Sequence, residues 1–190
     1  ITDIPKMENA EVADLMARFE PLVKHFNRYL TIGGFPELAL SDDDLYAQRM
    51  LREDVVDKVI KRDVLTLFKV RSPLLMEKLF LYLCMNSTEI FSATTAAKEL
   101  DNISPNTIES YVDALVKSNL IYMAYPIAVG SKSVLKGRPK IYIADAAIRN
   151  AVLMVDDVLS DERELGLLIE TTVYKHLVSF YQGTGAQLGY

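Results

Sequence analysis

The chain has 190 residues, of which half are hydrophobic, and a formal net charge of −5. This hydrophobic content is enough for a buried core and excludes wholesale disorder, while the negative charge excludes binding to nucleic acid or an anionic membrane through overall charge. One cysteine, Cys84, excludes an internal disulfide framework, and no hydrophobic stretch reaches the roughly 20 residues that span a bilayer. We therefore expect a cytoplasmic protein without a membrane partner.

The N-terminal part of the chain is predicted to be helical. It begins at Ile1, without an initiator Met or the basic-then-apolar order of a signal peptide, so we expect a segment of a longer protein. Hydrophobic residues recur at helical spacing over residues 9–30, and Pro21 predicts the end of one helix and the start of another.

A turn is predicted where this helical pattern stops. Paired glycines relax the steric limits on the backbone, and a proline disfavours helix at the residue before it. We expect a tight turn that tucks Phe35 inward, formed by Gly33, Gly34, Phe35, Pro36 and Glu37. Turn chemistry alone accounts for these residues, and a joint between two structural units is the alternative.

A long helix is predicted over residues 44–68. The run Ser41-Asp42-Asp43-Asp44 provides an N-cap and a first turn of carboxylates, which suit the positive end of the helix dipole. A calcium loop would need a different spacing and a closing Glu, so helix capping explains the acidic run better than metal binding. Charged residues of mixed sign further along indicate a solvated face.

The central part has the order of a winged helix-turn-helix domain. Ser-Pro steps at Ser72 and Ser104 predict the starts of helices over 73–85 and 104–118, and a shorter helix is predicted over 92–100. Residues 120–125 and 140–143 have the β-branched and aromatic content of two strands, joined by a hairpin loop over 130–139. Three helices followed by a β-hairpin indicate a winged helix from about residue 73 to residue 145.

Two further helices are predicted near the C-terminus, over residues 146–154 and from Asp161 to about residue 181. The chain then ends in a glycine-rich stretch at what we expect to be the start of a strand. The predicted fold class is therefore mainly α, with a helical linker, the winged helix and a C-terminal helix.

Nucleic-acid binding is one functional hypothesis for the winged helix. Its third helix, over residues 104–118, would face a groove of duplex DNA, and basic residues of the wing would contact phosphates. Glu109 and Asp113 on the same helix repel phosphate, and a solvated loop also explains the basic wing. The candidate residues are Ser104, Asn106, Thr107 and Ser110 on the helix, and Lys132, Lys136, Arg138 and Lys140 on the wing.

Catalysis by this chain is not predicted. The two histidines, His25 and His176, are about 150 residues apart, and no Ser or Cys lies in a nucleophile motif. A phosphate-binding Gly-x-x-x-x-Gly-Lys-Ser/Thr loop is also missing. We expect a noncatalytic chain that binds neither a metal nor a cofactor.

Several separated segments resemble the C-terminal region of prokaryotic AAA-superfamily P-loop ATPases, in which a winged helix is followed by a PD-(D/E)xK nuclease-like domain. The resemblance covers nearly the whole chain. It is carried by residues 29–30, 33–37, 61–64, 104–107 with Tyr111 and Leu115, 120–121, 140–145 and 166–173.

The resemblance implies three segments and a noncatalytic role. Residues 1–70 would be the end of the ATPase lid and a linker, 71–155 the winged helix, and 156–190 the start of a truncated α/β nuclease-like domain. Glu170 would match the acidic residue of that domain's first helix, and its other catalytic residues would follow Tyr190. ATP and Mg²⁺ would bind to the missing ATPase core.

Two partners then remain for the winged helix. Packing on its own ATPase core or on a neighbouring subunit, with coupling to the nucleotide state, is favoured over binding to duplex DNA by a small margin. The fold alone does not choose between them.

Overall fold

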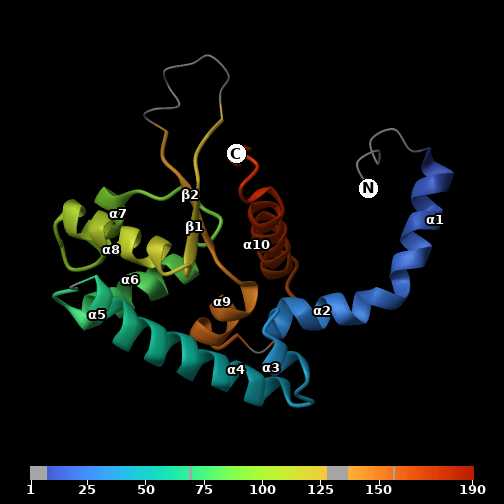
Figure 1. Ribbon diagram of the computed structural model, residues 1–190, viewed down its shortest axis with the longest axis horizontal. Helices are drawn as coiled ribbons and strands as arrows, with labels where there is room; N and C mark the ends of the chain where they lie inside the picture. The colour runs from blue at the N-terminus through green and yellow to red at the C-terminus, as the bar shows by residue number, and fades with distance from the viewer. Residues whose placement is uncertain (1–7, 69, 128–136, 156) are drawn as a thin grey trace.

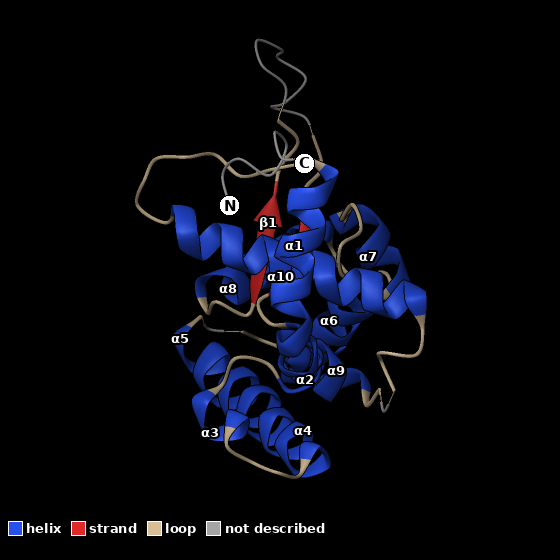
Figure 2. Ribbon diagram, turned by 90° about the vertical axis from the view of Figure 1, so that its right-hand side faces the viewer, coloured by secondary structure: helices blue, strands red, loops and turns tan. Residues whose placement is uncertain are grey.

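The computed structural model describes residues 8–68, 70–127, 137–155 and 157–190, and it is mainly helical with one two-stranded antiparallel sheet (Figures 1 and 2). The predicted mainly α class is confirmed at this level. None of the described helices is both long and apolar enough to cross a membrane.

The N-terminal helices form an arm, defined here as residues 9–32. It consists of α1 (Asn9–Phe19), a 3₁₀ turn η2 (Glu20–Leu22) and α2 (Val23–Ile32). Pro21 lies in the first turn of η2, which confirms the predicted break. Figure 1 shows α1 standing apart from α10, joined to the rest of the molecule through α2.

The predicted turn is shorter than expected, because Pro36 and Glu37 already belong to a helix. Proline suits a first helical position, and α3 (Pro36–Ala39) begins there. The long helix follows as α4 (Asp44–Arg52), a π-helical segment η3 (Glu53–Val64) and α5 (Leu65–Leu67). Its N-cap is Asp43, which accepts a hydrogen bond from the backbone of Tyr46 at 2.9 Å. The N-cap predicted within residues 41–44 is thus present at Asp43.

Three helices follow in the predicted places: α6 (Pro73–Met85), α7 (Ala93–Glu99) and α8 (Pro105–Lys117). The Ser72 and Ser92 hydroxyls cap α6 and α7 by accepting hydrogen bonds from backbone N–H groups at 3.3 Å. Ser104 precedes α8 without a side-chain cap bond. Positive φ angles at Asp101 and Asn102, 65° and 56°, make the tight turn between α7 and α8.

The two predicted strands pair as an antiparallel hairpin. β1 (Ile121–Ala124) and β2 (Lys140–Ile143) align Ile121 with Ile143 and Ala124 with Lys140. An antiparallel bridge joins Ile90 to Lys140, and a parallel bridge joins Tyr125 to Gly189. The strand start expected at the C-terminus is thus present as a single bridge.

The last two helices are α9 (Ala146–Leu153) and α10 (Glu162–Tyr181), capped by Asp145 and Asp161. The main core runs from Ile32 through the helices of the middle of the chain to Ala151. A second cluster joins Leu30 to Ala146 and Leu168, and a third joins Ala124 and Tyr142 to Tyr174. Hydrophobic packing therefore crosses both predicted segment boundaries, at residues 70 and 155.

Two leucines of α6 provide a test of the main core. Leu79 has none of its surface exposed, whereas 42% of Leu81 is exposed. We expect Leu79→Ala to lower the free energy of unfolding by about 2–5 kcal/mol, because it leaves a cavity, and Leu81→Ala by less than about 1 kcal/mol. Urea unfolding followed by circular dichroism measures both, and equal losses would contradict this description of the core.

Candidate functional site

Asp145 lies where β2 ends and α9 begins, and it connects three parts of the chain. Its Oδ1 accepts a hydrogen bond from the Ala147 N–H at 2.9 Å, which caps α9. Its Oδ2 forms an ion pair with Lys175 of α10. The same oxygen accepts a long hydrogen bond of 3.5 Å from the backbone N–H of Gly34, a residue that follows α2. We define Tyr29, Gly33, Gly34, Asp145 and Lys175 as the Asp145 junction.

Both glycines are required by close approach at this junction. Gly33 has φ 78° and ψ −172°, a backbone region that essentially only glycine adopts. A Cβ atom on Gly33 would lie 2.6 Å from Asp145 Oδ1, and a Cβ atom on Gly34 would lie 2.9 Å from the Tyr29 ring. Glycine, which predicted a turn at position 33, is thus also needed there because the backbone lies close to Asp145 and Ala147 at the start of α9.

Lys175 joins Asp145 to the arm. Its Nζ donates to the Tyr29 hydroxyl at 3.0 Å and lies 5.3 Å from the centre of that ring. Burial lowers the pKa of Lys175, but its hydrogen bond to Asp145 and the Asp145 charge outweigh burial and hold the pKa above its usual value of 10.5. Lys175 therefore stays charged at neutral pH. His176 contacts the Tyr29 hydroxyl from the same helix, with its Nε2 3.1 Å away.

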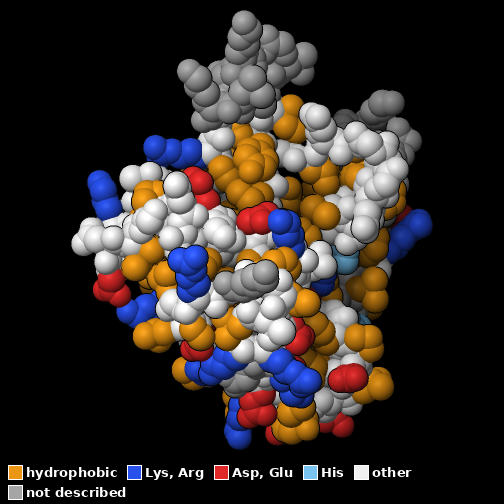
Figure 3. Space-filling view, turned by 60° about the vertical axis from the view of Figure 1, so that its left-hand side comes forward, with side chains coloured by type: hydrophobic (Ala, Val, Ile, Leu, Met, Phe, Trp, Pro, Cys, Tyr) orange, Lys and Arg blue, Asp and Glu red, His pale blue; other side chains and the backbone are white. Residues whose placement is uncertain are grey.

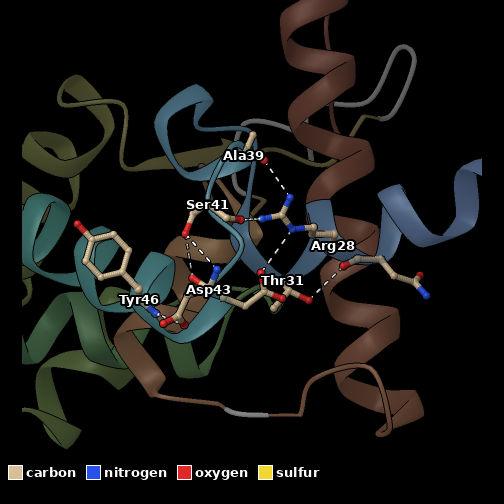
Figure 4. Close-up of polar contacts among 8 residues, drawn as sticks. Arg28, Thr31, Ala39, Ser41, Asp43 and Tyr46 are labelled. Carbon is tan, nitrogen blue, oxygen red and sulfur yellow. Dashed lines mark hydrogen bonds and ion pairs between the residues drawn. The ribbon is translucent and has the colours of Figure 1, made fainter.

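Arg28 fixes the segment that follows the turn (Figure 4). Its guanidinium donates to the carbonyls of Ala39, at 2.9 Å, and of Ser41, and its Nε lies 3.4 Å from Asp44. Phe35 is half-buried against the main core, as expected. Asp145 thus contacts the turn itself, and Arg28 holds the residues at the end of α3 and the start of α4.

Glu170, the predicted nuclease-like acid, attaches α10 to β2. Its carboxylate accepts hydrogen bonds from Lys140 Nζ at 3.1 Å and from the Tyr142 hydroxyl at 2.9 Å. Burial, reinforced by the hydrogen bond to Glu170 and its charge, raises the pKa of Tyr142 well above 10. The Tyr142 ring stacks on Tyr174 at 4.1 Å. This carboxylate already has two partners.

Arg149 makes a further connection that sequence reasoning missed. It is 3% exposed, donates from Nε to the Cys84 carbonyl at 3.0 Å, and forms two hydrogen bonds with Glu164, at 2.6 and 3.2 Å. An arginine within the apolar run of residues 146–153 was a signal for a buried ion pair. The Cys84 thiol is buried, and burial raises its pKa.

The predicted nucleic-acid residues are only partly brought together. Ser104, Asn106 and Ser110 are exposed at the start of α8, and Thr107 is half-buried. Arg138 is exposed, but Lys140 is paired with Glu170. Lys132 and Lys136 lie outside the described residues.

A hollow of about 450 Å³ lies between α7, α8 and the base of the hairpin. Its lining includes Phe91, Val112, Met123, Glu109, Asp113 and Arg138. Figure 3 shows hydrophobic side chains gathered near the base of the hairpin, with charged side chains beside them. Asp113 also pairs with Lys117 at 2.6 Å. Two carboxylates and one cation line this hollow, which does not favour a phosphate ligand.

The acidic run at residues 42–44 has structural roles. Asp43 caps α4 and Asp44 pairs with Arg28. Within the part of the chain that the structure describes, no three or more His, Cys, Asp and Glu side chains are grouped so as to hold a metal ion.

The glycine contacts give a matched pair of variants. Gly33 and Gly183 both have positive φ, 78° and 79°, but a Cβ atom on Gly183 would meet nothing within 4 Å. We expect Gly33→Ala to lower the free energy of unfolding by at least about 3 kcal/mol, from backbone strain and the clash with Asp145, and Gly183→Ala by about 1 kcal/mol or less. Chemical denaturation of both variants measures the difference. Equal effects would show that Asp145 does not press on the turn.

The ion pair of Asp145 and Lys175 is tested by a double-mutant cycle. The two side chains are 7% and 22% exposed. We expect Asp145→Asn, which keeps the cap of α9, and Lys175→Met each to cost about 3 kcal/mol, because each leaves a buried charge without its partner. The double variant should lose less than the sum of the single losses. Additive losses, measured by urea unfolding, would contradict a direct pair.

Comparison with known proteins places the chain in a family. It is 30% identical over 172 residues to uncharacterized protein MJ1637 and 25% identical over 160 residues to uncharacterized protein MJ1544, both of Methanocaldococcus jannaschii. These alignments cover 89% and 82% of this chain, which spans only about a third (35% and 34%) of the length of the two relatives. No solved structure gave a significant match. The model of the family described as "Domain of unknown function (DUF8612)" matches residues 23–159, and the chain belongs to that family.

Proposed function

We propose that this chain is a noncatalytic winged-helix and linker module of a prokaryotic AAA-superfamily ATPase. In this proposal it binds its own ATPase core or a neighbouring subunit and couples their movements to the nucleotide state. The winged helix would comprise α6, α7, α8, β1 and β2. Their order and the antiparallel hairpin support this part of the proposal.

The observation that carries the proposal is the Asp145 junction, because it takes residues from all three predicted segments. Tyr29 and Gly34 come from the linker, Asp145 from the winged-helix segment and Lys175 from α10. A buried ion pair is costly to separate, so a displacement of the arm acts on α9 and α10 together. A coupling module needs such a connection between the element that moves and the element that responds.

The remaining parts of the proposal concern what the chain does not do by itself. ATP and Mg²⁺ would bind to the ATPase core, and this module would hold no cofactor. If α10 opens a nuclease-like domain, metal binding by Glu170 would first have to displace Lys140 and Tyr142 from its carboxylate.

Duplex DNA binding is the second candidate function. It is favoured by the exposed Ser104, Asn106 and Ser110 at the start of α8 and by the exposed Arg138. It is opposed by the pairing of Lys140 with Glu170 and by the carboxylates of Glu109 and Asp113 beside Arg138. Protein binding is therefore the better supported function.

Coupling is tested in the polypeptide that joins this segment to the proposed ATPase core. We expect Asp145→Asn and Lys175→Met to change the ATP hydrolysis rate about fivefold or more, because ordinary coupling energies of 1–3 kcal/mol correspond to changes of this size. Lys98→Met is the control, because Lys98 is an exposed residue of α7, and it should leave the rate unchanged. Wild-type rates in folded junction variants would contradict coupling through Asp145.

Binding of duplex DNA is measured by fluorescence anisotropy at low and moderate salt. We expect little binding, and little further change when Lys132, Lys136 and Arg138 are replaced by Ala. Binding that weakens steeply with salt and is lost in the triple variant would favour the DNA alternative instead, because phosphate contacts release counterions.

A further inference from the structure

Tyr29 and His176 mark the place where the arm meets α10, with ring centres 5.8 Å apart. Side chains that follow one another at alternating steps of three and four residues share one face of a helix. Phe26 lies three residues before Tyr29 on α2, whereas Leu22 ends η2 and Phe19 ends α1; these three side chains are 42%, 51% and 47% exposed. We define the arm stripe as Met16, Phe19, Leu22, Val23 and Phe26, all of them exposed.

The same count along α10 gives a second exposed apolar face. From His176, the positions that share its face are Ile169, Val173 and Phe180, which are 36%, 51% and 77% exposed. Leu177 and Tyr181 lie next to them and are 39% and 40% exposed. We define the α10 stripe as Ile169, Val173, Leu177, Phe180 and Tyr181.

Figure 1 shows α1 and α10 standing apart, with α2 running between their lower ends, and the arm meets α10 at the contact of Tyr29 with His176. None of the ten side chains is charged, and monomeric soluble proteins rarely leave apolar patches of this size uncovered. The Asp145 junction fixes the C-terminal end of α2 on α9 and α10.

We propose that a second copy of this chain covers both stripes, with the arm of each copy lying between the arm and α10 of the other. If the two copies are related by a two-fold axis, each contributes its arm stripe and its α10 stripe to the same interface. The assembly is then complete as a dimer. The proposed function includes binding to a neighbouring subunit, and the second copy would be that subunit. This inference therefore rests on the proposed function.

The exposed area is sufficient for such a pair. The arm stripe side chains are between 42% and 68% exposed and those of the α10 stripe between 36% and 77%. Since a large aromatic side chain offers roughly 150–250 Å², each stripe supplies on the order of 400 Å², and the two together approach the roughly 800 Å² per partner of a standard interface.

The oligomeric state tests the proposal directly. Light scattering and sedimentation should show a dimer for the wild-type chain. Phe19→Asp and Phe180→Asp should each weaken dimerisation about 30-fold or more, since each buries a charge in the interface. Leu40→Asp is the matched control, because Leu40 is 89% exposed outside both stripes, and it should remain dimeric. As α1 has no buried residue, Phe19→Asp should keep the wild-type circular dichroism spectrum.

A crosslink then tests the arrangement. Cys84 is fully buried, so introduced thiols are the reactive ones. Mixing Phe19→Cys chains with Val173→Cys chains under oxidising conditions should give a disulfide-linked heterodimer, and mixing either with Leu40→Cys chains should not.

Two results would overturn the proposal. One is a wild-type chain that is monomeric at all concentrations, which would leave the stripes to another segment or protein. The other is a dimer that neither aspartate variant weakens. Either result leaves the ATP hydrolysis experiment unaffected, so failure of this inference is distinguishable from failure of the coupling function.

Discussion

The carboxylate of Asp145 determines how the parts of this molecule are arranged. It caps α9, pairs with Lys175 of α10 and receives the Gly34 N–H from the end of the arm. A buried carboxylate without these partners would destabilise the fold by several kcal/mol, so the three elements are stable only in this mutual arrangement. The glycine at position 33 follows from the same constraint, because a side chain there would collide with Asp145.

Other polar contacts reinforce this arrangement. Glu170 attaches α10 to the sheet through Lys140 and Tyr142, and Arg149 attaches α9 to Glu164 and to the end of α6. These charged groups are satisfied by one another, so they serve to position helices. Apolar side chains are exposed on the arm and on α10, the two elements joined by the junction, and this is one reason why protein contact is the function we favour.

Local features of the fold were predictable from sequence, and long-range contacts were not. Several helix ends are marked by local sequence, because capping residues, prolines and glycines act on the backbone next to them. Examples are Ser72 with Pro73, Asp161 and the pair Gly33 and Gly34. The partner of Gly34 lies 111 residues away, and no local pattern connects it to Asp145. Lys140 was expected on phosphate, but the fold places Glu170 beside it.

Hydrogen exchange in the Lys175→Met variant tests the central claim most directly. If Asp145 holds the arm, α9 and α10 as one unit, amide protection should fall together in residues 29–34, at the start of α9 and around residue 175, while α7 and α8 keep wild-type protection. Loss of protection confined to α10 would show that these elements are held independently and would contradict the account.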